Sequence, residues 1–430
     1  MGLEICVLEA LDDVFDEPPE TPTNLAGTPG ENETDEDVVS PEVTEELNRL
    51  KMLGRPYTAP SADELMPRTF VYSQKTNEQL DKRMVAEGRE RELGALCSQN
   101  ALFVIPRTAL SPGTKMVRGR FVDDMKNGRV KSRFVAAEVA RDVRYGVHAR
   151  TPALKALRMI VSLAATRDGK HRPRSIAFYD IVAAFVHASI DEVVGVVPQD
   201  GLLEKGECFL LLKALYGTRM ASKRWQRHYM RVLRTHGWNA SKVMPGFFHH
   251  RDPAGTCGCH GDDFMAEGSD ALLDRLDRVM ADEFEAKMLG RVGRGHLAEV
   301  KFLKRTIRWH ESEMCFSWSG GTRYVTELAV LLGLTDTRSV MMTRTPGTKA
   351  TGGNARDALE QLDTFQAATF RSAVGLIGYI VLDRPECQYA AKTVRSATRE
   401  PTNLDWMRMM RLAKFLVSHS ELEWIYQAQA

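Results

Sequence analysis

Hydrophobic and polar positions alternate in some stretches of the chain and recur at helical spacing in others. Two apolar arms, Met116–Val122 and Val130–Val135, flank Asn127-Gly128, a dipeptide typical of a two-residue hairpin turn. Residues 153–165 carry apolar side chains at helical spacing, and Thr151-Pro152 before them predicts a capped helix start. The pattern therefore predicts a hairpin followed by a core helix.

Strand and helix patterns continue to alternate through the middle of the chain. Short apolar runs at 175–180 and 209–213 predict strands, and helical spacing predicts helices at 221–236 and 270–285. A second hairpin is predicted within 300–319, and helical patterns dominate beyond it. This order predicts an α+β fold in which helices cover one face of a sheet, with a helical region from 311 to 430.

The first 75 residues differ in composition from the rest. Residues 1–50 contain fifteen Asp or Glu and a single basic residue, Arg49, while the remaining chain carries a net charge of +15. An acidic segment rich in Thr, Pro and Gly buries too little surface to offset its ordering entropy. We predict a disordered acidic leader over 1–75. The basic body favours a polyanionic partner, although a mildly basic globule with a solvated tail is the alternative.

Several classes are disfavoured by composition. No apolar run approaches the roughly 18 residues of a membrane span. No basic region followed by an apolar run marks a secretory signal, and seven scattered cysteines are typical of reduced thiols rather than a disulfide framework. We expect an intracellular protein of the cytoplasm or nucleus that is neither secreted nor membrane-bound.

The strongest candidate chemistry lies at Asp262-Asp263, between two stretches that can pair as strands. Two adjacent carboxylates repel each other unless a cation lies between them, although a polar hairpin tip has the same composition. Asp180 adds a third acid at the end of an apolar strand, where a lone carboxylate is unfavourable. Three acids at the ends of neighbouring strands match the oxygen ligands that two Mg²⁺ ions require.

Basic residues supply a second set of candidates. Lys131 and Arg133 are two positions apart on a predicted strand and project from one face, where they can clamp phosphate oxygens. Arg158 lies off the apolar stripe of its helix and can reach solvent or a ligand. Cations along 219–234 fit a nucleic-acid groove; for all of these residues a solvated face is the alternative.

The motifs in this order resemble the reverse transcriptase of copia-type LTR retrotransposons, over about 90–426. The similar segments are Val130 to Val135, Asp180 to Phe185, Leu212 to Gly217 with Trp225, Thr345-Pro346, Phe370 to Tyr379, Asp383 to Pro385 and Pro401 to Trp406. The resemblance implies a right-hand polymerase with a ferredoxin-like palm sheet. Fingers and palm would occupy 76–310, and a helical thumb or connection-like region 311–430, without an RNase H domain.

Roles for individual residues follow from this resemblance. Asp180, Asp262 and Asp263 would be catalytic and, with the Ile181 carbonyl, would bind two Mg²⁺ ions, with Mn²⁺ as an alternative. Contacts to the incoming dNTP are implied for Lys131, Arg133, Phe185 and Gly217, and Phe185 would exclude a ribose 2′-hydroxyl. The implied contacts to an RNA or DNA template-primer are Arg158, Arg219, Lys223 and Arg224.

Departures from the family pattern keep other functions open. His260-Gly261 stands where the family usually has Tyr-Val before the two acids, the preceding strand is rich in Cys and Gly, and Arg219-Met220 replaces a common Lys-Gln pair. Cys257, Cys259 and His260 suggest zinc, but no fourth ligand is evident. The alternatives are a catalytically silent element remnant that folds and binds nucleic acid, and an RNA-dependent RNA polymerase. The expected context is a polyprotein with integrase and RNase H parts.

Overall fold

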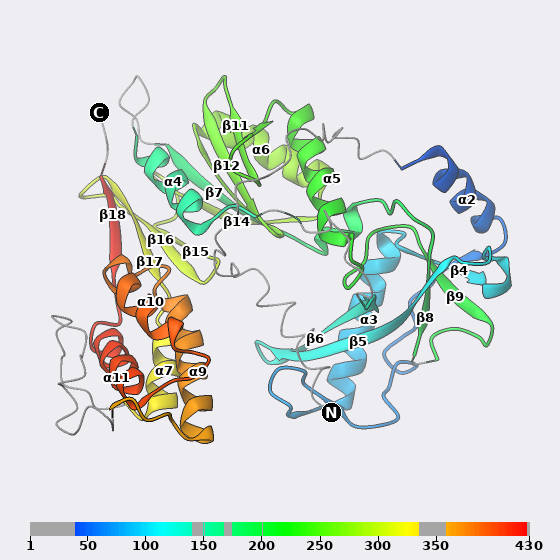
Figure 1. The fold of residues 1–430 in the computed structure, drawn as a ribbon. Helices are drawn as coiled ribbons and strands as arrows, with labels where there is room; N and C mark the ends of the chain where they lie inside the picture. The colour runs from blue at the N-terminus through cyan, green and yellow to red at the C-terminus, as the bar shows by residue number, and fades with distance from the viewer. Residues whose placement is uncertain are drawn as a thin grey trace, which may run out of the picture. The chain divides into compact units, whose positions relative to one another are not determined.

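The computed structural model describes residues 39–139, 149, 151–166, 174–199, 201–334 and 358–427. Its backbone forms two compact units (Figure 1). The first unit comprises residues 1–152, 179–264 and 271–288, and the second comprises residues 153–178, 265–270 and 289–430. Helices and sheets occur in both units, so the predicted α+β class is confirmed.

The predicted disorder of 1–75 is wrong for residues 39–75; the rest of that segment lies outside the described residues. Helix α2 (Pro41–Lys51) begins at Ser40, whose hydroxyl accepts a hydrogen bond from the Val43 N–H. Strand β1 (Arg55–Pro56) pairs with β4 (Leu102–Pro106), and Leu50 and Leu65 are buried. The acidic average concealed these few apolar anchors, whose burial stabilises the segment. A small hairpin, β2 (Val71–Tyr72) and β3 (Gln79–Leu80), follows.

A six-stranded sheet in the first unit has the order β1-β4-β9-β8-β5-β6. The predicted hairpin is confirmed as β5 (Lys115–Lys126) and β6 (Arg129–Ala137), with Asn127 and Gly128 both at positive φ in the turn. The sheet is completed by β8 (Val194–Pro198) and β9 (Glu207–Leu211). Helix α3 (Lys82–Ser98) packs on this hairpin through Leu93 and Leu96.

A second sheet has the order β10-β11-β12-β13-β7-β14, and the division into units runs through β7, β13 and β14. It carries the three predicted acids. The predicted helices at 221–236 and 270–285 are confirmed as α5 (Ala221–Thr235) and α6 (Asp270–Glu283). The strands and the short helix that follows β7 are β7 (Ser175–Ile181), η3 (Ala184–His187), β10 (Asn239–Ala240), β11 (Phe247–His250), β12 (Gly255–His260), β13 (Asp263–Gly268) and β14 (Ala286–Val292).

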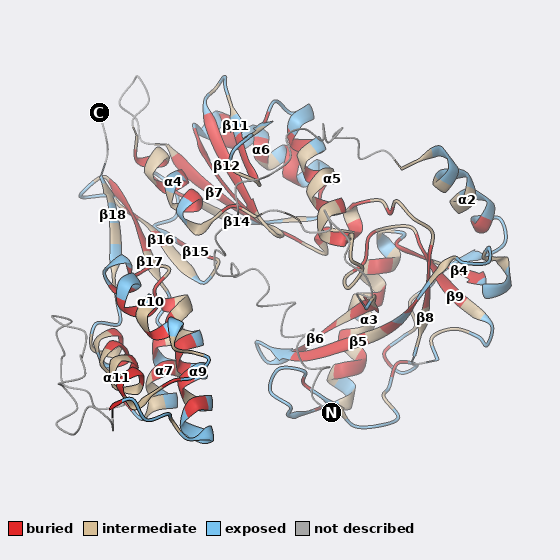
Figure 2. Cartoon of the chain, viewed as in Figure 1, coloured by how far each residue is buried: buried red, intermediate tan, exposed pale blue. Residues whose placement is uncertain are grey.

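The second unit combines a four-stranded sheet with a cluster of helices. The sheet order is β15-β16-β17-β18, and the helices pack around Phe370, Ile377 and Leu412. Figure 2 shows buried residues on the inner faces of these elements. The elements are α4 (Leu154–Ala165), β15 (Glu299–Phe302), β16 (Arg305–His310), β17 (Cys315–Gly320), α7 (Arg323–Leu332), α9 (Thr364–Ile380), η5 (Pro385–Cys387), α10 (Gln388–Ser396), α11 (Asn403–Ser418) and β18 (Glu423–Gln427).

Two details of the sequence prediction change in this unit. Helix α4 has Ala153 as its N-cap and no side-chain cap, so the predicted Thr151 cap is wrong. Strand β18, which ends the predicted helical region, was not predicted, because a five-residue strand gains its stability from pairing with β17 rather than from local pattern.

The motif Thr345-Pro346 lies outside the described residues. None of the described helices has the length and apolar character needed to cross a membrane.

Candidate active site

The two adjacent acids lie at the turn between β12 and β13. Gly261 occupies the turn with φ +70°, a conformation that favours glycine over other residues. The indole N–H of Trp225 donates a hydrogen bond to the Gly261 carbonyl at 2.8 Å and so ties the turn to α5. Cys257 and Cys259 on β12 are fully buried, and burial raises the pKa of both thiols. The Cys-rich strand therefore packs as small, neutral, apolar side chains.

Asp180 at the end of β7 joins this pair. The Ile181 N–H donates to the Asp262 carbonyl at 3.0 Å, which holds the end of β7 beside the turn. Burial, followed by the charges of Asp262 and Asp180, raises the pKa of Asp263 to about 7. Burial and Asp180 also raise the pKa of Asp262. The structure thus gathers the three predicted acids, and their mutual repulsion makes the carboxylates receptive to a cation.

Basic side chains from three strands face these acids. Lys131 and Arg133 on β6 oppose the rise in the pKa of Asp262, so both predicted cations act on the same acid. Lys126 on β5 acts in the same way on Asp263. Lys287 Nζ on β14 lies 3.5 Å from Asp180 Oδ2. Lys126 and Lys287 were not predicted, because only the packing of segments far apart in the sequence places them near the acids.

Phe185 and Tyr216 form an aromatic pair in the same unit. Phe185 lies on η3, and its ring centroid is 4.9 Å from that of Tyr216. Burial, then Asp262 and Glu92, raise the pKa of the Tyr216 phenol. Neither Tyr216 nor Glu92 was predicted, although Tyr216 lies directly before Gly217.

Position 217 requires glycine, because the backbone of β6 passes close to it. Its φ is +84°, and a Cβ at this position would lie 2.2 Å from the Ala136 carbonyl oxygen. The Ala136 N–H in turn donates to the Tyr216 carbonyl at 2.8 Å. The close approach that the structure shows at Gly217 is therefore to β6, and its predicted contact with the nucleotide stays a prediction.

The four residues predicted to contact template-primer have different environments. Arg224 is buried in an ion pair with Asp191, so its prediction as a surface contact is wrong: a buried guanidinium needs a carboxylate partner and is removed from phosphates. The Arg158 guanidinium, in the second unit, lies 4.5 Å from the ring centroid of Trp424. Arg219, whose backbone N–H donates to Glu138, and Lys223 are partly exposed at the start of α5.

The donor set at the acid turn suits a small hard cation. Across the described part of the chain, no three His, Cys, Asp or Glu side chains are placed to ligate a single ion. Mg²⁺ in phosphoryl-transfer sites is usually held by one or two carboxylates, with phosphate oxygens and water in the other positions. Asp180, Asp262 and Asp263 meet this smaller requirement, because they offer partly buried carboxylates that lie close enough to repel one another.

These features gather acids and basic side chains in one place in an α+β protein, and part of the chain matches a known family. Residues 100–306, just under half of the chain, match the family model described as reverse transcriptase (RNA-dependent DNA polymerase). The matched segment contains Lys131, Asp180, Asp262 and Asp263. This match agrees with the enzyme class that the sequence predicts, a reverse transcriptase. No curated protein is significantly similar in sequence.

Solved structures provide more distant similarities. A foamy viral protease-reverse transcriptase in complex with double-stranded DNA has a TM-score of 0.39 and 9% identity, over 88% of this chain and 56% of that chain. The same viral protein in complex with an RNA/DNA hybrid gives 0.39 and 10%, over 88% and 44%. Telomerase from Candida tropicalis gives 0.31 and 7%, over 56% and 62%. The chain spans about half the length of the foamy viral chains.

Proposed function

We propose that the chain is an RNA-directed DNA polymerase of the copia type that extends a primer with dNTPs by a two-metal mechanism. The observation that carries the proposal is the placement of Asp180 beside Asp262-Asp263, with Lys131 and Arg133 acting on the same acids. Nucleotidyl transfer needs two components: acids that repel one another until metal ions bind, and cations within reach of those acids. Both lie within the segment that the family model matches.

The chain's own residues have distinct parts in this proposal. Asp180, Asp262 and the Ile181 carbonyl would hold the metal ions, with Asp263 beside them. Bound Mg²⁺ would supply Lewis acidity toward the primer hydroxyl and the triphosphate. Lys131 and Arg133 would neutralise triphosphate oxygens. Trp225 would keep the acid turn in place through the Gly261 carbonyl.

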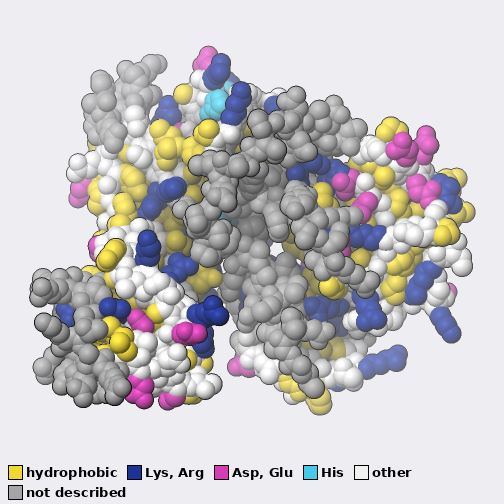
Figure 3. Space-filling model, viewed as in Figure 1, with side chains coloured by type: hydrophobic (Ala, Val, Ile, Leu, Met, Phe, Trp, Pro, Cys, Tyr) yellow, Lys and Arg dark blue, Asp and Glu magenta, His cyan; other side chains and the backbone are white. Residues whose placement is uncertain are grey.

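Phe185 is the residue that favours DNA as the product. It is held by Tyr216 in the same unit as the acids, and an aromatic side chain under the sugar would exclude a ribose 2′-hydroxyl. The partners would be dNTPs and an RNA or DNA template-primer, inside the cell, with integrase and RNase H parts of a polyprotein. On the face drawn in Figure 3, Lys and Arg side chains lie at several separate places among the described residues. The phosphate contacts would accordingly be distributed.

Primer extension with the purified chain tests the proposal. RNA and DNA templates are each supplied with dNTPs or NTPs, in Mg²⁺ or Mn²⁺. We expect dNTP incorporation, with Asp262→Asn reducing it at least about 100-fold because an acid facing the reacting phosphate is lost. Asp282→Asn, which removes an exposed acid from α6, is the matched control and should retain the parental rate.

Each other outcome rejects a specific part of the proposal. Incorporation by the parent no greater than by Asp262→Asn would identify a catalytically silent remnant, the outcome that His260-Gly261 before the acids would then explain. A preference for NTPs would instead identify an RNA polymerase and overturn the role given to Phe185.

A further inference from the structure

Helix α3 provides hydrogen-bond partners for backbone groups on the outer edge of β6, which is the last strand of its sheet. The Arg91 guanidinium donates to the Val130 carbonyl at 3.1 Å, and the Phe134 N–H donates to Glu92 Oε1 at 3.0 Å. These two contacts enclose the stretch of β6 that carries Lys131 and Arg133. Glu92 therefore anchors the backbone immediately after Arg133.

The same carboxyl group is surrounded by the charges proposed to bind nucleotide. Arg133 and Lys131 on β6 both favour the ionised form of Glu92, and Glu92 in turn raises the pKa of Tyr216. On its own helix, Arg89 is paired with Asp123 of β5 at 2.8 Å, and Arg91 contacts the β6 backbone. Burial opposes these cations and raises the pKa of Glu92 to about 7. Glu92 is thus an acid with only a marginal preference for its charged form.

We propose that Glu92 is a positioning residue for the incoming nucleotide: it fixes β6 at Phe134 and is the counter-charge that Lys131 and Arg133 exchange for the triphosphate. This inference rests on the nucleotide-binding role proposed above for these two cations. Before nucleotide binds, the Glu92 carboxylate orders both side chains. When the triphosphate draws the cations to itself, the carboxylate loses its stabilising partners and takes up a proton from solvent. Binding of the triphosphate is therefore weakened by an ionised Glu92.

Binding of inorganic tripolyphosphate to the full chain tests this exchange without requiring catalysis. Glu92→Gln keeps an oxygen acceptor for the Phe134 N–H but removes the competing charge. We expect this variant to bind tripolyphosphate about three- to tenfold more tightly than the parent at pH 8, and equally well at pH 6, where the parental carboxyl is protonated. In primer extension the same change should lower KM for dNTP at pH 8 rather than raise kcat.

Matched variants separate this role from a structural one. Glu90→Gln removes a carboxylate from the same helix and should bind like the parent at both pH values. Glu92→Asp keeps the charge and should retain the parental pH dependence, which supplies a folded comparison if the Gln variant unfolds. Equal ratios of pH 8 to pH 6 affinity in Glu92→Gln and the parent would overturn the inference. An absence of primer extension with the binding effect intact would reject only the polymerase.

Discussion

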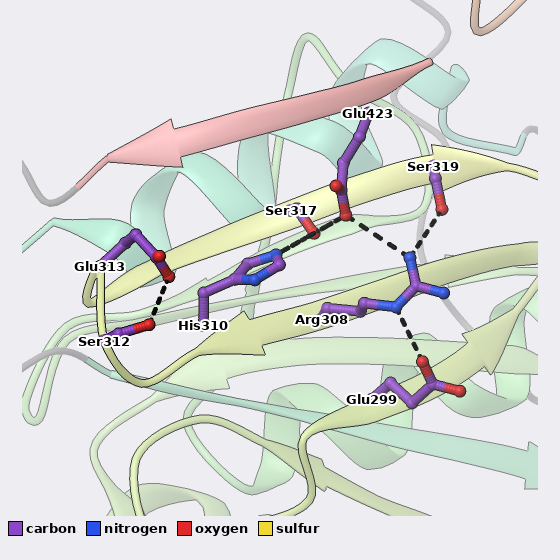
Figure 4. Close-up of polar contacts among 8 residues, drawn as sticks. All are labelled: Glu299, Arg308, His310, Ser312, Glu313, Ser317, Ser319 and Glu423. Atoms are coloured by element: carbon purple, nitrogen blue, oxygen red, sulfur yellow. Dashed lines mark hydrogen bonds and ion pairs between the residues drawn. The ribbon is translucent and has the colours of Figure 1, made fainter. Parts of the chain in front are cut away.

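Carboxyl pKa values shift in opposite directions at two places in the molecule. One is the acid turn, Gly261–Asp263, and the other is the polar face of the four-stranded sheet. At the acid turn, burial and neighbouring acids raise the pKa of Asp262 and Asp263. On the polar sheet face, Glu423 accepts a hydrogen bond from the Ser317 hydroxyl, and His310 and Arg308 lie 3.6 Å and 3.5 Å from its Oε1 (Figure 4). The pKa of Glu423 is lowered, chiefly by Ser317.

The difference separates carboxylates that repel one another from a structural network whose charges are paired. On the polar sheet face each acid has a donor or a cation: Glu299 pairs with Arg308 at 2.8 Å, and Ser317, which is fully buried, joins Glu423 to His310. Nothing further is needed to neutralise these groups. At the acid turn, like charges are held together by packing, an arrangement that has a cost without a bound cation.

The packing beneath the acid turn should give the largest effect. Trp225 is 2% exposed, contacts Tyr229 and Phe284 at ring distances of 5.3 Å and 5.4 Å, and donates to Gly261. We expect Trp225→Ala to lower the free energy of unfolding by about 3–5 kcal/mol, because a large cavity and an unsatisfied carbonyl result. Urea unfolding followed by circular dichroism measures this change.

A gentler substitution removes the hydrogen bond with less loss of packing. Trp225→Phe keeps a buried six-membered ring and loses the indole N–H with the rest of the five-membered ring. It should cost about 1–3 kcal/mol of stability, yet reduce primer extension disproportionately if the turn must be held in place. A variant with normal activity would show that packing alone positions the acids.

Removing one of the repelling acids should stabilise the protein. The pKa of Asp263 rises from its ordinary value of 3.8 to about 7 in the folded chain, so the parent loses stability as the pH rises through this interval. Asp263→Asn does not lose this stability, because asparagine has no carboxyl group to ionise. We expect it to be about 1–2 kcal/mol more stable than the parent at pH 8 and equal to it near pH 4, with partial exposure limiting the gain.

Magnesium provides the internal control for this variant. Added Mg²⁺ should raise the melting temperature of the parent at pH 8 and narrow the gap to Asp263→Asn, because a bound cation relieves the same repulsion. If Asp263→Asn is less stable than the parent at pH 8, the acid turn resembles the polar sheet face and the comparison fails.

The parts predicted from sequence share a local signal. Asn127-Gly128 between apolar arms predicted its hairpin, and the apolar stripe of 221–236 predicted a buried face that includes Trp225. The three acids were found because each lies near the end of a predicted strand. Sequence alone did not reveal Glu92, Lys287 or the pairing of Arg224 with Asp191, because these contacts depend on strand order and on loops that local patterns do not specify. Leu50 was missed because the composition of its segment obscured a single anchor.

The smallest effect is expected on the polar sheet face. Since the pKa of Glu423 is lowered in the folded chain, its stabilisation is present above the ordinary value of 4.5 and is lost as the pH falls below it. Glu423→Gln should therefore cost about 0.5 kcal/mol at pH 7, a value reduced by solvent screening of this partly exposed group. The difference should vanish near pH 3. Thermal unfolding at the two pH values measures it, and Glu421→Gln, two residues before on an exposed segment, is the matched control. At neutral to alkaline pH, we expect Glu423→Gln to lower the free energy of unfolding and Asp263→Asn to raise it. This result would establish that the polar sheet face stabilises the fold, whereas the acid turn destabilises it.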